Sequence, residues 1–160
     1  MPCRTLASIV GCLFICITGA CTSVSDESVS QPSPDLEVDQ ALSLQLEALK
    51  STGNTRRGVA QMFAFASPKS REMMGSYEAF AALIQTHLTP LLGHRSSRTV
   101  ILEESDIRVR YQVTVTDGEG DERHYEWVLE NMPTPACQFC WLNTYIHPMA
   151  TPEKGATIEI

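Results

Sequence analysis

The chain has 160 residues, a formal net charge of −7 at pH 7 and 43% hydrophobic residues. Its length suits one domain rather than two. No basic cluster is longer than the pair Arg56–Arg57, and nucleic-acid binding depends on a dense cationic surface. The composition therefore argues against a nucleic-acid partner, and the acidity is interpreted as a source of solubility.

The N-terminus has the order of an export signal. Arg4 supplies a positive charge, residues 6–17 are apolar, and small residues at positions 18–20 precede Cys21. The apolar run is too short to anchor the chain across a bilayer. This order resembles the lipobox of bacterial lipoproteins, in which the cysteine receives a diacylglyceryl group, although Thr18 stands where Leu or Val is usual. The resemblance implies a lipoprotein signal peptide over residues 1–20 and a lipid on Cys21. The alternative is an ordinary cleaved signal.

Residues 21–34 are predicted to form a tether between the lipid and the folded domain. The segment is rich in Ser and Pro and has almost no large apolar side chain, so it buries too little surface to fold. Thr22 rather than Asp follows the cysteine. In the Gram-negative sorting rule, Asp at that position favours the inner membrane. The resemblance therefore implies a chain that is lipid-anchored in the cell envelope, at the outer membrane and facing the periplasm if the host is Gram-negative.

Helical patterns fill the first half of the domain. Asp35 is a candidate N-cap for a helix with apolar residues at positions 38, 42, 46 and 49, and Gly53-Asn54 ends it. Residues 58–66 form a second, shorter helix. Ser67-Pro68 predicts the start of a third helix, which Gly75 ends. Ser76 can cap a fourth, whose apolar stripe ends at Thr89-Pro90 and consists of Phe80, Leu83, Ile84, His87 and Leu88. Met62, Met73 and Met74 are interpreted as core residues.

Alternating apolar and polar residues predict strands in the second half. A first strand is expected at residues 99–103. Residues 107–116 and 123–131 flank a Gly-rich turn and should pair as an antiparallel hairpin, and residues 137–146 form the last strand. Because no helix separates consecutive strands, the fold class is α+β, with helices packed on a sheet of three to four strands. The domain is expected over residues 35–148, followed by a loose tail over residues 149–160.

Residues 60–84, AQMFAFASPKSREMMGSYEAFAALI, carry a family resemblance. They are similar to the signature of the bacterial and plastid family catalogued as domain of unknown function 4864. Pro90-Leu91 and Cys140-Trp141 also fit that pattern, although Leu88 replaces an aromatic residue common before the Pro-Leu pair. The resemblance covers about residues 35–148. It implies a nuclear-transport-factor-like or cystatin-like cone, in which a curved antiparallel sheet wraps helices, and it implies no activity because the family is uncharacterised.

Motifs for phosphate, dinucleotide or zinc-protease chemistry are not found, and no cofactor or metal is expected. Cys137 and Cys140 could be a redox motif, half of a zinc site or a structural disulfide. A zinc site needs more ligands, a redox motif needs a helix start, and an exported chain favours oxidation. Residues three apart in a strand point to opposite faces, so a disulfide requires a turn at Gln138-Phe139.

The expected binding site lies between the two halves of the chain. The residues expected to meet there and to line any pocket are Phe80, Ile84, His87, Tyr111 and Trp127. His87 could instead be a core histidine with one hydrogen bond. The main hypothesis is a non-catalytic envelope lipoprotein that binds a small apolar ligand or a partner protein. The rival is a cone-fold enzyme that uses a buried acid or His87 for proton transfer, and the fold alone does not decide between them.

Overall fold

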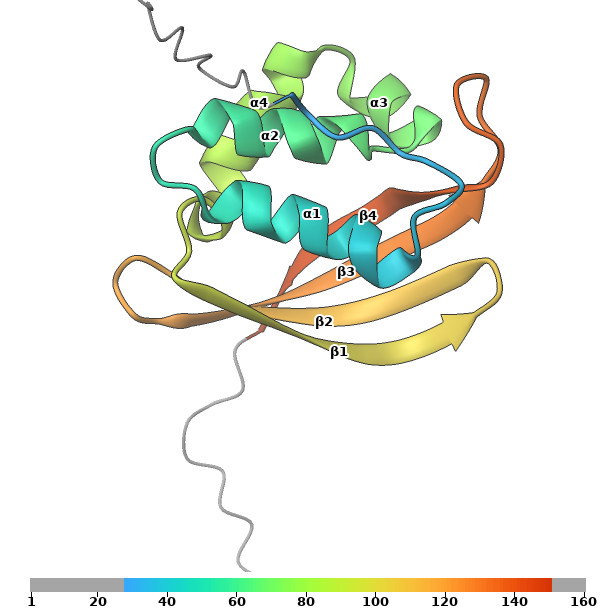
Figure 1. Ribbon diagram of the computed structural model, residues 1–160. Coiled ribbons are helices and arrows are strands. Elements are labelled where there is room, and N and C mark those ends of the chain that lie inside the picture. Colours follow the sequence, from blue (N-terminus) through green and yellow to red (C-terminus); the bar gives the residue numbers. More distant parts are fainter. Residues whose placement is uncertain (1–27, 151–160) are drawn as a thin grey trace, which may run out of the picture.

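The computed structural model describes residues 28–150, so the predicted signal peptide, Cys21 and most of the predicted tail lie outside the described residues. Its helices are α1 (Val38–Lys50), α2 (Thr55–Ala64), α3 (Pro68–Met74), α4 (Tyr77–His87) and the 3-10 helix η1 (Thr89–Leu91). The strands are β1 (Ser96–Ser105), β2 (Arg108–Thr116), β3 (Glu122–Met132) and β4 (Cys140–Met149). They form one antiparallel sheet in the order β1-β2-β3-β4, with the helices over one face (Figure 1). The predicted α+β class is confirmed.

Short polar side chains set the starts of the helices. Asn54, Ser67 and Ser76 each accept a hydrogen bond from a backbone N–H in the first turn of α2, α3 and α4, which satisfies one of the donors that a helix start leaves unpaired. Asp35 does not cap α1. Glu37 does so through a capping box with Gln40, because the backbone at Asp35 is already held in a turn by the Ser33 hydroxyl.

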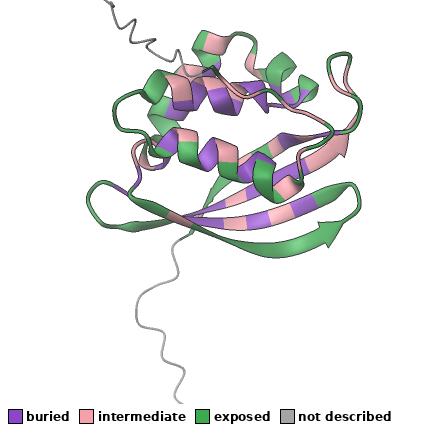
Figure 2. Cartoon of the chain, in the orientation of Figure 1, coloured by how far each residue is buried: buried purple, intermediate pink, exposed green. Residues whose placement is uncertain are grey.

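The buried face of the sheet follows the predicted alternation. Figure 2 shows buried and less buried residues alternating along β2, and the same pattern places the inward side chains of β2 and β3 in one core: Val109, Tyr111, Val113, Val115, Tyr125, Trp127 and Leu129. Ile107 departs from it. This residue lies in the turn between β1 and β2 and is 68% exposed, because Ser105 hydrogen-bonds across the turn to the backbone of Arg108 and closes the hairpin before the strand begins.

Helix α1 lies over the sheet, and α2 packs closely beside it. Gly58 makes this approach possible, since a Cβ atom at its position would lie 2.8 Å from the carbonyl oxygen of Ala48. The space between α1 and the sheet is filled by core side chains that include Leu42, Leu46 and Leu49. The centre of the fold is therefore packed, and an open cavity must lie to one side of it.

Strand β1 forms a free edge of the sheet. Its residues are exposed apart from Ser97, which is half-buried, and they include the apolar run Val100, Ile101 and Leu102. A β-bulge between Ile101 and Glu103 interrupts the pairing register. Bulges and charged residues on an edge strand hinder pairing with another chain, so this edge is protected despite its apolar run.

Part of the segment predicted as a tether contacts the domain. Residues 28–34 were assigned to it, but the backbone N–H and C=O of Ser30 both hydrogen-bond to the side-chain amide of Gln61 in α2, at 2.9 and 2.8 Å. Val29 also packs against the core. The low hydrophobicity of the segment did not indicate these contacts, because a side-chain amide on α2 supplies hydrogen bonds that cannot be read from the composition of the segment.

Candidate functional site

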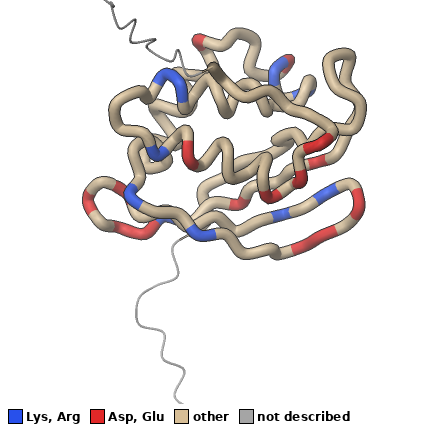
Figure 3. Tube along the Cα trace, viewed as in Figure 1, with Lys and Arg blue, Asp and Glu red and all other residues tan. Residues whose placement is uncertain are grey.

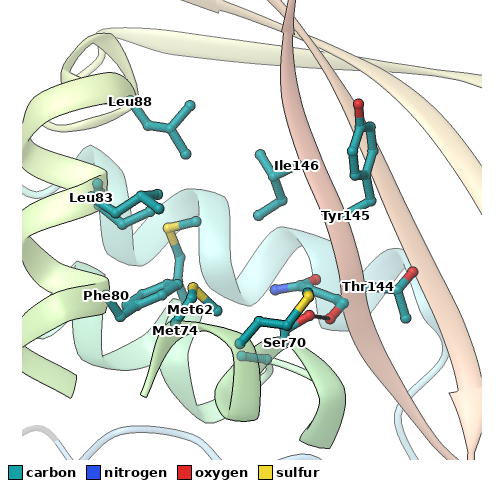
Figure 4. Close-up of a pocket in the computed structure, with 13 residues that line it drawn as sticks. Met62, Ser70, Met74, Phe80, Leu83, Leu88, Thr144, Tyr145 and Ile146 are labelled. Carbon is teal, nitrogen blue, oxygen red and sulfur yellow. Dashed lines mark hydrogen bonds between the residues drawn. The ribbon is translucent and has the colours of Figure 1, made fainter. Parts of the chain in front are cut away.

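A cavity of about 190 Å³ opens between the helices and the last strand. Phe80, Leu83 and Leu88 lie on one side and face Ile146 of β4 across the space (Figure 4). The remaining lining residues come from α2, α3, α4 and β4 and the residues next to them, and they are Met62, Ala66, Ser70, Met73, Met74, Ile84, Asn143, Thr144 and Tyr145. Most of this lining is apolar, and the cavity is partly open to solvent.

Two polar residues in the lining are engaged in hydrogen bonds with the protein. The Asn143 side chain accepts from Trp127 Nε1 at 2.9 Å and pairs with the Gln45 amide in both directions. Ser70 Oγ lies 2.8 Å from Ser67 Oγ. Because of these bonds, Asn143 and Ser70 do not require a hydrogen-bonding group from a ligand. None of the described lining residues is charged, so the site favours a ligand group that is itself apolar.

Of the five residues expected to line a pocket, Phe80 and Ile84 do so. Tyr111 and Trp127 lie directly opposite each other on β2 and β3 and belong to the same core cluster, but neither reaches the cavity. The Tyr111 hydroxyl donates to Asp39 Oδ1 of α1 at 2.6 Å. Burial, followed by this hydrogen bond and the charge of Asp39, raises the pKa of Tyr111 above its ordinary value. These two aromatic residues join α1 to the sheet rather than forming a binding wall.

His87 does not face the interior. It is the last residue of α4 and is exposed, whereas Leu88, the C-cap residue, is buried and lines the cavity. In the sequence, His87 falls on the apolar stripe predicted for the helix. In the structure α4 ends at His87, and the chain then turns Leu88 toward the interior. Neither the core-histidine interpretation nor the proposed use of His87 as a buried base agrees with this position.

The methionines were interpreted together but have different environments. Met62 is fully buried in the core, whereas Met73 is 70% exposed at the rim of the cavity. The residues of β4 that line the cavity were not identified as site residues from the sequence. Residues Thr144–Ile146 read as an ordinary strand, and only the position of α3 and α4 beside that strand makes them part of a site.

Cys137 and Cys140 are joined by a disulfide, with Cα atoms 5.9 Å apart. The turn that such a bond requires is present, because Phe139 has a φ of 60° and the bend at residues 138–139 precedes β4. Among the described residues, no group of three or more His, Cys, Asp or Glu side chains is arranged to hold a metal ion. Within residues 28–150, no helix has both the length and the apolar character needed to span a bilayer.

Comparisons with protein-family models, with curated proteins and with solved structures gave no match. The resemblance to the domain of unknown function 4864 family and the lipoprotein resemblance therefore stay predictions. The class of the protein is defined by its fold and its cavity: an α+β domain with helices over one face of a four-stranded antiparallel sheet and an apolar cavity beside the last strand.

Proposed function

We propose that this chain is a lipid-anchored protein of the bacterial cell envelope and that it binds a small apolar ligand between α3, α4 and β4. The uncharged, mainly apolar lining of the cavity is the observation that carries this proposal. An engineered cavity of about 150 Å³ lined by Leu, Ile and Phe stays dry and binds benzene. A cavity of about 190 Å³ therefore suits an aromatic ring or a short hydrocarbon chain.

The lining favours binding over catalysis. General acid–base chemistry needs ionisable groups that converge on a reacting atom, and the residues around this cavity provide none that is charged. The other main candidate, a protein-binding module, would place its apolar contact surface outside a filled core. Here the core beneath the sheet is filled, but an apolar space remains beside it. This arrangement favours the binding of a small ligand over the binding of a protein.

Binding of a neutral fluorescent probe, N-phenyl-1-naphthylamine, tests the proposal. The wild-type chain should bind the probe and raise its emission. Ile146→Trp places a larger side chain in the cavity and should weaken binding by about tenfold or more, since the added ring occupies the volume that the probe needs. Ile107→Trp adds the same ring at an exposed position remote from the cavity and should leave the affinity unchanged.

A second variant tests the same cavity by adding a charge rather than volume. Leu83→Asp puts a charge at the partly exposed rim of the cavity and should also weaken probe binding, because entry then requires the charge to be desolvated. Far-UV circular dichroism verifies that each variant is folded. Equal probe affinity in wild type, Ile146→Trp and Leu83→Asp would exclude this cavity as the site.

The lipid anchor is tested separately. Behind its own signal, the wild-type chain should partition into the detergent phase, because a diacylglyceryl group on Cys21 buries many methylenes in the membrane. Cys21→Ala, exported from an ordinary cleavable signal, should partition into the aqueous phase. If both chains enter the detergent phase to the same extent, the lipidation proposal is wrong, whereas probe binding by the domain would be unaffected.

A further inference from the structure

The charges of the domain are unevenly distributed. Residues 55–87, which contain α2, α3 and α4 but not the acidic helix α1 and are called the helical layer below, carry four basic residues against two acidic ones. The other described residues, 28–54 and 88–150, carry six basic and thirteen acidic residues. Figure 3 shows basic residues on α2 and α3, and acidic residues on α1 and along the strands and their turns, where basic residues also lie. The helical layer is therefore the positive side of an acidic molecule.

The same layer exposes large apolar side chains. Met73 on α3 is 70% exposed and Leu83 on α4 is 41% exposed. Both lie at the rim of the cavity. Lys69 and Arg71 of α3 are exposed near them, and Arg71 keeps its guanidinium over the ring of Phe63 while donating to the carbonyl of Ala64. The exposed Glu72 lies next to Met73, so α3 carries two basic residues and one acidic residue around this apolar side chain. Exposed apolar residues beside a net positive charge are typical of a surface that rests in the interface of an anionic bilayer.

The start of the described chain lies on this side of the molecule. Ser30 is bonded to Gln61 of α2, and the chain enters the domain over the helices rather than at the sheet (Figure 1). Six residues lie between Cys21 and residue 28, and the seven steps from one to the other span at most roughly 25 Å when the chain is fully extended. A lipid on Cys21 would thus hold the helical layer close to the membrane surface.

From these observations we infer that the helical layer docks directly on an anionic phospholipid bilayer, with Met73 and Leu83 entering the headgroup region and Lys69 contacting lipid phosphates. The inference stands apart from the proposed function, because it needs neither an occupied cavity nor a lipid on Cys21. It also orients the molecule: the cavity rim faces the membrane, and the acidic sheet with its free edge β1 faces away from it.

The test is co-sedimentation of residues 22–160 with lipid vesicles. This chain lacks the signal and Cys21 but keeps all the described helices and strands. Vesicles of equal parts phosphatidylglycerol and phosphatidylcholine should bind it about tenfold more strongly than pure phosphatidylcholine vesicles at low salt. Because the attraction is partly electrostatic, binding should weaken when the ionic strength is raised to about 0.5 M.

Two matched pairs of variants locate the contact. Met73→Asp should lower the partition coefficient by about fivefold or more, whereas Ile107→Asp, at a residue that is 68% exposed, should have little effect. Lys69→Glu should weaken binding more than Lys50→Glu, although both change the net charge equally and both residues are exposed on helices. All four positions are at the surface, so folding should be retained, and circular dichroism verifies it.

Either of two results would overturn the inference. One is that the wild-type chain does not sediment with phosphatidylglycerol vesicles at low salt. The other is that Met73→Asp and Ile107→Asp bind the vesicles equally strongly. That result would mean that any attraction comes from the overall charge or from another surface. Probe binding in the cavity is measured without vesicles, so a failure here is distinguishable from a failure of the proposed function.

Discussion

Trp127→Ala should lower the free energy of unfolding by about 3–5 kcal/mol. The Trp127 side chain has no exposed surface, lies opposite Tyr111 and donates its indole N–H to Asn143. Its removal leaves a void in the packed centre of the fold and takes one of two donors from Asn143 Oδ1, which still accepts from the Gln45 amide. Urea denaturation at pH 7, followed by circular dichroism, measures the change, and the m-value should stay the same if the unfolded state is unaffected.

Phe80→Ala is the matched comparison. Phe80 is also buried but lies at the cavity, so its side chain already has open space on one side and makes fewer contacts. The loss of stability should therefore be clearly smaller than for Trp127→Ala. Equal losses of stability would mean that the cavity collapses in solution and that Phe80 is packed as tightly as Trp127. A negligible loss of stability for Trp127→Ala would mean that the helices do not cover this face of the sheet.

Asn143→Leu should cost roughly 2–5 kcal/mol of stability, because it leaves a buried donor on Trp127 and a buried acceptor on Gln45 without partners. The substitution keeps the approximate volume, so lost packing is a minor part of the expected effect. Adding Gln45→Leu to Asn143→Leu should recover part of the loss, since the unpaired acceptor is then removed as well. Urea midpoints of the two single variants and the double variant form the required cycle.

Asn131→Leu is the control for this prediction. Asn131 is half-buried on β3, and its Oδ1 has no hydrogen-bond partner within the described part of the chain, so replacing it should cost less than about 1 kcal/mol. If Asn131→Leu and Asn143→Leu destabilise the domain to the same extent, the network around Asn143 contributes nothing beyond ordinary burial. The Asn143 side chain also lines the cavity, so Asn143→Leu offers an independent variant for the probe-binding measurement.

Local patterns in the sequence determined most of the secondary structure. Alternation along residues 109–115 and 125–129 placed the correct side chains on the buried face of the sheet, and Ser67-Pro68 and Ser76 marked two helix starts. Both signals are local. Alternation follows from the geometry of a strand with one buried face, and a helix cap follows from the residues next to the helix start. Boundaries were less accurate where a side chain hydrogen-bonds to the backbone, as Ser105 does in the turn that contains Ile107 and Gln61 does at Ser30.

The position of the cavity was decided only by tertiary structure. The sequence placed Phe80, Ile84, Tyr111 and Trp127 on apolar faces, but it did not indicate that α1 would fill the space over Tyr111 and Trp127 while α3 and α4 stand beside β4. That outcome depends on the close approach of α1 and α2 at Gly58 and on the bonds from Asn143 to Gln45 and Trp127. Such contacts join residues far apart in the chain, and whether facing side chains fill a space or leave a void depends on their volumes in three dimensions.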